Sequence, residues 1–443
     1  MKNILKFCVV FLAIACNGEV AKSDDFEWTG LGGNNSWNNA GNWENVTMGG
    51  GSDVDGIPDA DDSVVFSINA STTNGQASEI TVNAGVELQL LLGTITVFDT
   101  IINNGTIQFA DTPNSSSNET LAIAGEVLLQ GDGEIVLVNQ SDSLIADAGD
   151  GVLRNLGNTI RGAGFVGAAV VNEALIRAEN GELEFFAQSL DNSAGTIEIA
   201  SNGALNGSES LTPIFGGTIT GEPGGATIRG AYRDTTFEGL VFVDLIGAEF
   251  SNTIINNGTI QFADTPNSSS NETLFIVGDV TLLGFGEIFL VNSNDSLIAG
   301  SGGGQLSNQE NTIRGRGRVN VPVINNGTLF ADWPNADLVF NGSVSLPPVG
   351  SSVLAIRLDG LNSSQSSRLV FTNSIPTNGT LKIVAGDNFD AVVGQSTEVI
   401  SSSGFQGPGF PLLNFSMAQS LTCLLYTSPS PRDRQKSRMP SSA

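Results

Sequence analysis

Hydrophobic and polar residues alternate along many short stretches of this chain. The alternation has a period of two in runs such as Thr106–Phe109, Glu134–Val138 and Thr196–Ile199. A period of two places successive side chains on opposite faces of a β-strand. Asn-Gly, Asp-Gly and Ser-Asn-Gly separate the runs, and these residues tolerate the positive φ of a tight corner. No stretch combines sustained 3.6-residue periodicity with helix caps, so the body is predicted to be all-β.

The chain contains a long internal duplication. Thr100–Leu121 recurs without change as Thr253–Leu274, and the similarity continues at the same offset without a gap. The duplicated unit spans residues 100–179 and 253–332. A unit that is copied whole packs mainly against its neighbours along the chain, which is typical of a solenoid.

Two all-β architectures fit short strands joined by tight turns. Antiparallel hairpins would form a sandwich or propeller, whereas coils of a right-handed parallel β-helix would stack each strand on its equivalent in the next turn. Similar phrases recur at unequal intervals, as in Ile102–Ile107, Val171–Ile176 and Ile324–Leu329. Coils of about 20–30 residues with variable turns produce that pattern, because loop length has little energetic cost. The sequence therefore favours the β-helix, with stacked Asn and Ile ladders.

The predicted domains follow from these patterns. Residues 24–68 are expected to form an N-terminal cap or entry module, residues 69–340 the β-helix, and residues 341–422 a truncated C-terminal β segment. At the end of a β-helix the open strand edges and the apolar core need a cover. We interpret Trp28, Trp37 and Trp43 as part of that cover and not as rings that stack on carbohydrate.

Both ends of the chain differ from the body. Residues 1–23 are predicted to be a signal peptide, because Lys2 and Lys6 flank the short apolar stretch Phe7–Ala15. The alternative is lipid modification of Cys16, which directly follows that stretch. Residues 423–443 resemble the translation of a sequencing adapter, so we exclude them from the fold and expect the natural chain to continue beyond Thr422.

Composition narrows the range of chemistry. The chain has 46 Asp and Glu, 18 Lys and Arg and no His, for a net charge of −28. Seven of the 18 basic residues lie outside residues 24–422, so the body is more acidic still. Without His the commonest general base and metal ligand is missing, and Cys is confined to the two ends. An acidic chain repels nucleic acid, so no nucleic-acid partner is expected.

The corner sequences resemble those of a known class of proteins. Val323–Leu329 and Gly157–Gly164 are similar to the coils of bacterial secreted β-helical proteins, which include haemagglutinin-like adhesins and autotransporter passengers. Trp28–Phe66 and Leu338–Phe389 are similar to the entry and exit segments of such proteins. The resemblance covers nearly the whole body, but its motifs are low in complexity and specify a fold better than a family. It implies a secreted or surface-displayed repeat protein.

The densest group of carboxylates lies in the predicted cap. Asp53, Asp55, Asp59, Asp61 and Asp62 fall within ten residues of one another. Calcium takes roughly six to eight oxygen ligands, which such a loop could supply. The spacing is not that of an EF-hand, because no glutamate closes the loop at the twelfth position. We interpret the group as a solvated loop and assign no metal.

The polar group Arg229, Tyr232, Arg233 and Asp234 lies between the two copies. β-helical polysaccharide lyases use an Arg or Lys base beside Asp-bound calcium, so this group is the natural catalytic candidate. It lacks a matching ladder of acids, and a polar insertion between the repeats explains it as well. We therefore assign no catalytic residue.

Three further arginines, Arg314, Arg316 and Arg318, alternate with small or apolar residues. On one strand they would share a face and could accept an anionic sugar or the carboxylates of a neighbouring chain. The first copy has Arg161, Ala163 and Phe165 at the corresponding positions, so the stripe is not part of the repeat. We expect these arginines to pair with acids of their own chain.

These observations predict a secreted or cell-surface β-helical repeat protein with a structural or adhesive role, not an enzyme. It would bind cell-surface glycans or extracellular matrix through an extended lateral surface, without a cofactor and without a transmembrane segment of its own. The rival class is a polysaccharide lyase or hydrolase on a β-helix. That class requires carboxylates and Arg at corresponding positions of consecutive coils, and no such cluster is evident in the sequence.

Overall fold

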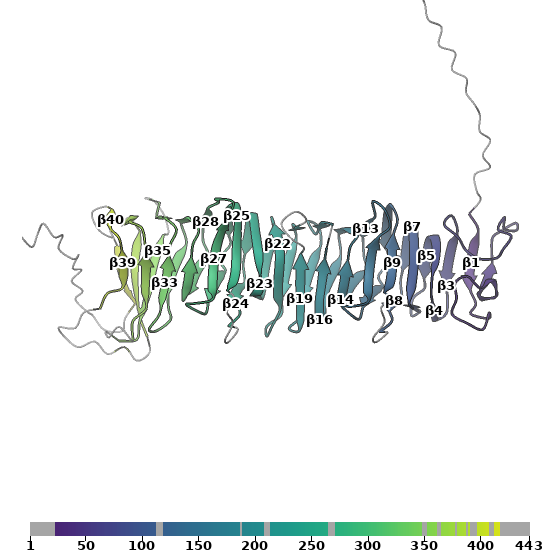
Figure 1. The fold of residues 1–443 in the computed structure, drawn as a ribbon, viewed down its shortest axis with the longest axis horizontal. Helices are drawn as coiled ribbons and strands as arrows, with labels where there is room; N and C mark the ends of the chain where they lie inside the picture. Colours follow the sequence, from purple (N-terminus) through teal and green to yellow (C-terminus); the bar gives the residue numbers. More distant parts are fainter. Residues whose placement is uncertain are drawn as a thin grey trace, which may run out of the picture.

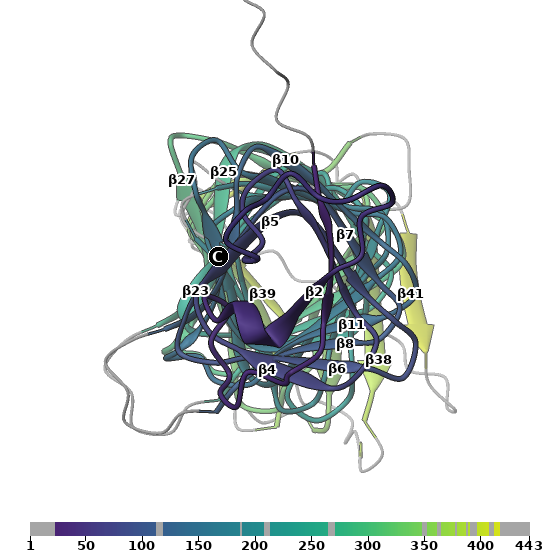
Figure 2. The ribbon, with the colours of Figure 1, turned by 90° about the vertical axis from the view of Figure 1, so that its right-hand side faces the viewer.

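The protein is an elongated rod of stacked coils (Figure 1). The computed structural model describes residues 23–111, 118–186, 188–207, 213–264, 271–347, 352–360, 365–376, 379–386, 389, 397–406 and 412–416. Seen along the rod, the strands surround one common interior (Figure 2). Neighbouring strands pair in parallel from coil to coil, so the predicted parallel β-helix is confirmed and the hairpin alternative is excluded.

Most coils contribute one strand to each of three parallel ladders. In the first half of the rod, ladder I contains parts of β5 (Gly75–Val82), β7 (Gly93–Asn103), β9 (Glu119–Ile123), β12 (Ser143–Asp147), β14 (Thr159–Val166), β16 (Leu175–Phe185), β19 (Gly203–Gly207) and β22 (Thr227–Arg233). Ladder II contains β1 (Asp25–Trp28), β3 (Ser63–Phe66), β10 (Glu126–Gln130), β13 (Val152–Asn155), β15 (Ala169–Asn172), β17 (Leu190–Asp191), β20 (Ile214–Phe215) and the remaining parts of β5, β7 and β22. Ladder III contains β4 (Ala70–Thr72), β6 (Glu87–Leu90), β8 (Thr106–Phe109), β11 (Glu134–Leu137), β18 (Thr196–Ile199), β21 (Thr218–Gly221) and parts of β14, β16 and β23 (Thr236–Asn256).

The same three ladders continue through the second half. Ladder I passes through β23 to β24 (Thr259–Phe262), β26 (Glu287–Leu290), β29 (Thr312–Gly315), β32 (Thr328–Ala331), β35 (Val353–Leu358), β38 (Thr380–Ala385) and β41 (Leu412–Ser416). Ladder II passes through β25 (Glu272–Leu283), β27 (Ser296–Ser301), β30 (Gly317–Val319), β33 (Asp337–Phe340), β36 (Arg368–Phe371) and β39 (Ile400–Ser402). Ladder III passes through β25, β28 (Leu306–Asn308), β31 (Val323–Asn325) and β34 (Val344–Ser345). Beyond β34, β37 (Ile375–Pro376) contacts this ladder and pairs with β40 (Phe405–Gln406) as a separate two-stranded sheet.

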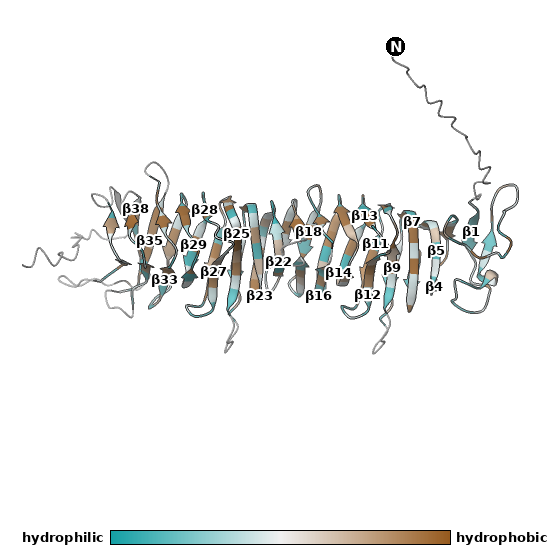
Figure 3. Cartoon of the chain, turned by 45° about the horizontal axis from the view of Figure 1, so that its top comes forward, coloured by the Kyte–Doolittle hydropathy of each residue, from teal (hydrophilic) through white to brown (hydrophobic). Residues whose placement is uncertain are grey.

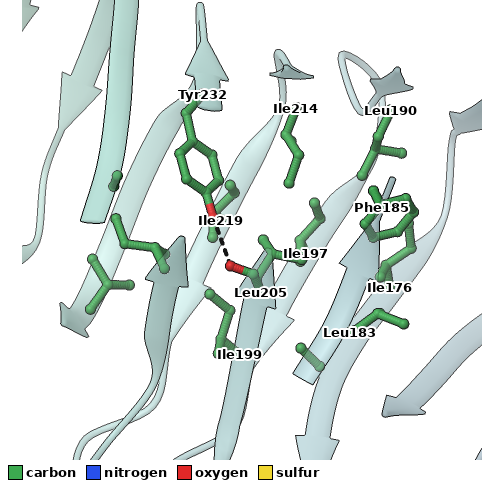
Figure 4. Packing of buried hydrophobic residues seen from close by; sticks show 14 of the residues in the cluster. Ile176, Leu183, Phe185, Leu190, Ile197, Ile199, Leu205, Ile214, Ile219 and Tyr232 are labelled. Atoms are coloured by element: carbon green, nitrogen blue, oxygen red, sulfur yellow. Dashed lines mark hydrogen bonds between the residues drawn. The ribbon is translucent and has the colours of Figure 1, made fainter. Parts of the chain in front are cut away.

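Stacked aliphatic side chains fill the interior. On ladder III the inward positions of successive coils are Ile107, Ile135, Ile160, Ile176, Ile197 and Ile219, each no more than 2% exposed. Burying one such side chain contributes about 2 kcal/mol. Hydrophobic and hydrophilic residues alternate along the strands (Figure 3), and three of these isoleucines point into the interior in Figure 4. Period-two alternation therefore supplies a core because one face of every strand is turned inward.

Buried asparagines form a second ladder at the corners. The Asn103 side-chain amide donates to the Asn158 Oδ1 at 2.7 Å, and the Asn155 amide donates to Asn172 at 2.9 Å. The amide of Asn172 donates in turn to the Asn192 Oδ1 at 2.7 Å. Side-chain amides thus bond to one another from coil to coil where the chain turns, which confirms the predicted Asn ladder. Only at the end of this run does a nitrogen, the Asn192 Nδ2, have no partner among the described residues.

The N-terminal end of the rod is covered by a small cap. It contains β1, the 3₁₀ turn η1 (Ala40–Asn42), β2 (Trp43–Asn45) and β3. Strand β2 pairs antiparallel with β1, whereas β3 pairs parallel with β1 and leads into ladder II. On one side of β1, the antiparallel strand β2 closes the end of the solenoid. On the other side, β3 begins the parallel pairing that continues along the rod.

The two copies of the duplicated unit enter the ladders at different positions. Thr100–Asn103 lies in ladder II, but the identical Thr253–Asn256 lies in ladder III, where the Asn257 amide donates to the Phe237 carbonyl at 2.9 Å. The following strand of the first copy, β8, lies in ladder III, and its counterpart β24 lies in ladder I. Equivalent outward side chains of the two copies therefore belong to different ladders.

Beyond residue 340 the parallel pairing continues without a break, from β32 through β35 and β38 to β41. The predicted signal peptide falls almost entirely, and the adapter-like segment wholly, outside the described residues. Within the part of the chain that the structure describes, no helix is long and apolar enough to cross a bilayer.

Candidate functional surfaces

The three tryptophans of the cap are buried. Trp28, Trp37 and Trp43 are at most 7% exposed, and the Trp43 ring lies 4.9 Å from that of Trp28 and 4.7 Å from that of Trp37, between ring centroids. Phe66 packs against all three rings. A Cβ on Gly75 would lie 2.0 Å from the Trp37 ring, so the first coil fits directly beneath it. The rings cover the end of the core, as predicted, and are not free to stack on a sugar.

The acidic group of the cap is bound to backbone amides. Asp62 is buried, and its two carboxylate oxygens accept from the amides of Asp24, at 2.8 Å, and Asp59, at 2.9 Å. Burial raises the pKa of Asp62, and a side-chain hydrogen bond with Asp61 raises the pKa of Asp59. The solvated-loop interpretation is therefore wrong for Asp62, whose side chain organises the turn.

The other acids of this loop differ in exposure. Asp53 is half-buried and donates its amide to the Asp24 carboxylate at 2.7 Å, whereas Asp55, Asp59 and Asp61 are exposed. Among the described residues no group of three or more Asp, Glu, Cys or His is arranged to hold a metal ion.

The structure separates the predicted polar group around Tyr232. Tyr232 points into the core, is fully buried, and donates its hydroxyl to the Leu205 carbonyl at 3.0 Å (Figure 4). Arg229 and Arg233 lie on the outside, and Arg233 forms a 3.8 Å ion pair with Asp234. The four residues therefore form no common site, because side chains an odd number of positions apart on β22 face opposite ways.

Arg229 instead belongs to a cluster that spans several coils. Its guanidinium donates to the Asp244 carboxylate at 2.7 and 2.9 Å and also binds Glu182. The Asn206 amide donates to the other oxygen of Glu182 at 2.7 Å. Glu184, Asn206 and Arg229 occupy the same register position on three consecutive coils. The sequence did not reveal this cluster, because its members become neighbours only once the coils are in register.

A shallow, open pocket of about 360 Å³ lies beside this cluster. Its lining includes Gly181, Glu182, Asn202, Gly203, Thr227 and Arg229. Burial raises the pKa of Glu184, and the charge of Glu182 raises it further. A carboxyl with a raised pKa beside a paired carboxylate is a common arrangement in glycosidases, although structural ion pairs shift pKa values in the same way.

A second charged network lies on ladder III of the first copy. Arg161 binds Glu134 and Glu179, both at 2.9 Å. Arg177, in the next coil, binds Glu179 at 2.9 Å. Its other partners are Glu198 at 2.5 Å and Glu222 at 2.6 Å. Hydrogen bonds that Arg177 donates to these carboxylates, that to Glu179 foremost, raise the pKa of Arg177.

The three arginines of the second copy do not lie along one strand face. Arg314 lies on β29 and Arg318 on β30, with Arg316 in the corner between these strands. Gly315 has a φ of +103°, which turns the chain from ladder I toward ladder II between Arg314 and Arg318. Arg314 pairs with Glu287 at 2.6 Å and with Asp332 at 2.9 Å, as expected. The expected pairing is wrong for Arg316 and Arg318, which have no carboxylate within ion-pair distance among the described residues.

Two aromatic side chains that were not singled out in the sequence lie beside these arginines. The Arg314 guanidinium lies 3.6 Å from the centroid of the Phe289 ring, and that of Arg316 lies 4.4 Å from the Trp333 ring. The two rings are 5.9 Å apart. Their partners are in adjacent coils, so no sequence spacing indicates the contacts.

Comparison with known proteins gives no match. No family model, no characterised protein and no solved structure matches this chain. Evidence about function therefore rests on the fold and on the surfaces described above.

Proposed function

We propose that this chain is a secreted or cell-surface β-helical repeat protein with a structural or adhesive role. The single observation that carries the proposal is the form of the molecule, a long rod with three lateral faces and a filled core. A solenoid exposes an extended surface on which many weak contacts can add up. The resemblance of its corner sequences to secreted bacterial adhesins and autotransporter passengers supports the same role.

The partners proposed for these faces are cell-surface glycans or extracellular matrix. Outward side chains bind one another in chains along the rod, as in the Arg161 and Arg177 network. Such ordering fixes the polar groups of the surface before a ligand arrives, which lowers the entropic cost of binding.

The proposal is tested by passing the purified full chain over immobilised neutral glycans, acidic glycans and matrix proteins. We expect retention on at least one class, with dissociation that becomes slower as ligand density rises, because attachment is multivalent. Absence of retention on every surface would contradict an adhesive role.

A polysaccharide lyase or hydrolase is the second candidate, and the cluster of Glu182, Glu184 and Arg229 beside the pocket favours it. Incubation with pectin, alginate and neutral glucans, followed by assays for reducing ends and unsaturated products, separates the two classes. Turnover that disappears in Glu184→Gln would establish the enzyme and overturn the adhesive assignment.

A further inference from the structure

The second copy differs from the first mainly in its outward residues. On corresponding coils the first copy has Val136, Arg161 and Arg177, whereas the second has Phe289, Arg314 and Phe330 in the same order. The turn after β32 is also two residues longer than its counterpart in β16, because Gly164 pairs with Leu183 but Gly317 pairs with Leu338. Trp333 lies in this longer turn, next to Arg316 of the preceding coil.

Arg316 and Arg318 differ from every other described arginine of this protein. The described arginines other than these two each form an ion pair with a carboxylate, namely Arg154, Arg161, Arg177, Arg229, Arg233, Arg314, Arg357 and Arg368. Among the described residues, the Arg316 guanidinium donates only to the Val291 carbonyl, at 2.5 Å. Arg318 donates to the Asn271 side chain at 3.0 Å and to the Asn294 carbonyl.

Two cations without carboxylates are unusual on so acidic a chain. The net charge is −28, so acids are abundant, and yet none lies within ion-pair distance of these guanidiniums in the described structure. The Nε of Arg318 is buried, and no described residue accepts a hydrogen bond from it. Each guanidinium carries five N–H donors in a planar fork that matches a carboxylate or sulfate. Four donors of Arg316 and the two of the Arg318 Nη1 have no acceptor among the described residues and can serve a ligand.

We propose that Arg316, Arg318 and Trp333 form a binding site for an acidic polysaccharide, which the first copy does not possess. The guanidiniums of Arg316 and Arg318 would bind the carboxylate or sulfate groups of the sugar. The partly exposed Trp333 ring would contact the apolar face of a sugar ring. The inference rests on the proposed adhesive function and names its substrate class and its place on the rod.

A sugar chain fits this surface better than a second copy of the protein. The arginines lie beside the aromatic pair Trp333 and Phe289, whose rings suit the C–H face of a sugar. A second copy would bring its own net charge of −28 against a molecule of the same charge. A flexible polysaccharide can place single anionic groups at the two guanidiniums without bringing a whole acidic face into contact.

The test compares substitutions in the two copies of the full chain. R316A introduces alanine, the residue that the first copy has at the corresponding position, Ala163, so this variant is expected to fold. W333A removes the indole ring. The control R154S also removes one positive charge, and it introduces the residue that the second copy holds at Ser307. Binding to polygalacturonate, alginate and neutral dextran is measured by calorimetry in the presence of a chelator, together with the thermal unfolding midpoint.

We expect the wild-type chain to bind a polyuronate and not dextran. R316A and W333A should each weaken that binding about tenfold or more with an unchanged midpoint, and R154S should leave it unchanged. Equal binding by R316A and wild type would overturn the inference, whether or not the unfolding midpoint falls. The hydrogen bond from Arg316 to the Val291 carbonyl would then have only a structural role.

Two further outcomes distinguish this inference from the proposed function. Retention of wild type on matrix proteins or neutral glycans, without binding to any polyuronate, would overturn the acidic-sugar site and leave the adhesive role standing. Sedimentation is run in parallel on wild type and R316A. Self-association that R316A abolishes, in the absence of polyuronate binding, would identify a second copy as the occupant and also overturn the inference.

Discussion

In the first copy of the duplicated unit, residues 100–179, the outer face carries the charged network of Arg161, Arg177 and Glu179. In the second copy, residues 253–332, one arginine of that pair is retained as Arg314, and Phe330 takes the place of the other. The outer face of the second copy therefore keeps the ion pairs of Arg314 but loses those of Arg177, and it adds contacts between guanidiniums and aromatic rings.

The interiors of the two copies hardly differ. Asn103 bonds to Asn158 at 2.7 Å, and the equivalent Asn256 bonds to Asn311 at 2.8 Å. This agreement holds although the copies occupy different ladders. This shows that the residues of a coil determine the structure of its corner and core. The outward residues of the coil can differ without changing that structure.

The largest expected effect tests whether the interiors are equivalent. Asn103→Ala and Asn256→Ala each remove a buried amide and leave its partners unsatisfied, so each should lower the free energy of unfolding by about 2 kcal/mol. The two losses should agree within about 0.5 kcal/mol, measured by urea denaturation. The exposed neighbours Asn104→Ala and Asn257→Ala are the controls and should have little effect. Unequal losses would show that the ladder position, and not the coil, determines stability.

A smaller effect distinguishes the two outer faces by their response to salt. Arg177→Ala removes the common partner of three glutamates and should cost about 1 kcal/mol at low ionic strength, falling as salt is added. Phe330→Ala removes apolar contact at the corresponding position and should cost a similar amount that salt does not reduce. Unfolding in low and high sodium chloride provides the measurement. A salt-dependent loss for Phe330→Ala would contradict the contrast between the faces.

The smallest effect concerns pH. Hydrogen bonds from Arg314 lower the pKa of Glu287. A lowered pKa means that this carboxylate stabilises the fold above its unfolded pKa and that the stabilisation is lost as pH falls through the folded value. Glu287→Gln should therefore cost about 0.5 kcal/mol at pH 7 and nothing at pH 2.

The matched substitution in the first copy sharpens the same comparison. Glu134 receives one hydrogen bond from Arg161, at 2.9 Å, whereas Glu287 receives two from Arg314, at 2.6 and 2.9 Å. Glu134→Gln should thus cost less than Glu287→Gln in urea titrations run at both pH values. A larger loss of stability for Glu134→Gln than for Glu287→Gln would contradict the conclusion that Glu287 and Arg314 form the stronger ion pair.

Several features of the fold could be predicted from local patterns alone. The alternation in runs such as Thr106–Phe109 predicted strands with one buried face, and the recurring Asn-Asn-Gly corners predicted stacked coils. Trp37 was expected in the cap and lies buried above Gly75. These predictions were correct because each was based on a pattern of residues that are close together in the chain.

The candidate surfaces could be predicted only in part. Arg229 was singled out, but its partners Glu182 and Asp244 lie 47 and 15 residues away. The stripe from Arg314 to Arg318 was placed on one strand, although Gly315 turns the chain within it. Coil length explains the difficulty, since it ranges from 15 residues between Ile228 and Val243 to 32 between Thr380 and Leu412.

The sequence by itself determined that the chain forms short strands with an apolar face, turns at Asn and Gly, and packs like residues on one another. Only the tertiary structure decided which outward side chains meet, and that the second copy enters the rod one ladder later than the first. The physical reason is that an unequal number of residues closes each coil. Side-chain direction is a local property of a strand, but the neighbour across a ladder is set by the length of the whole turn between them.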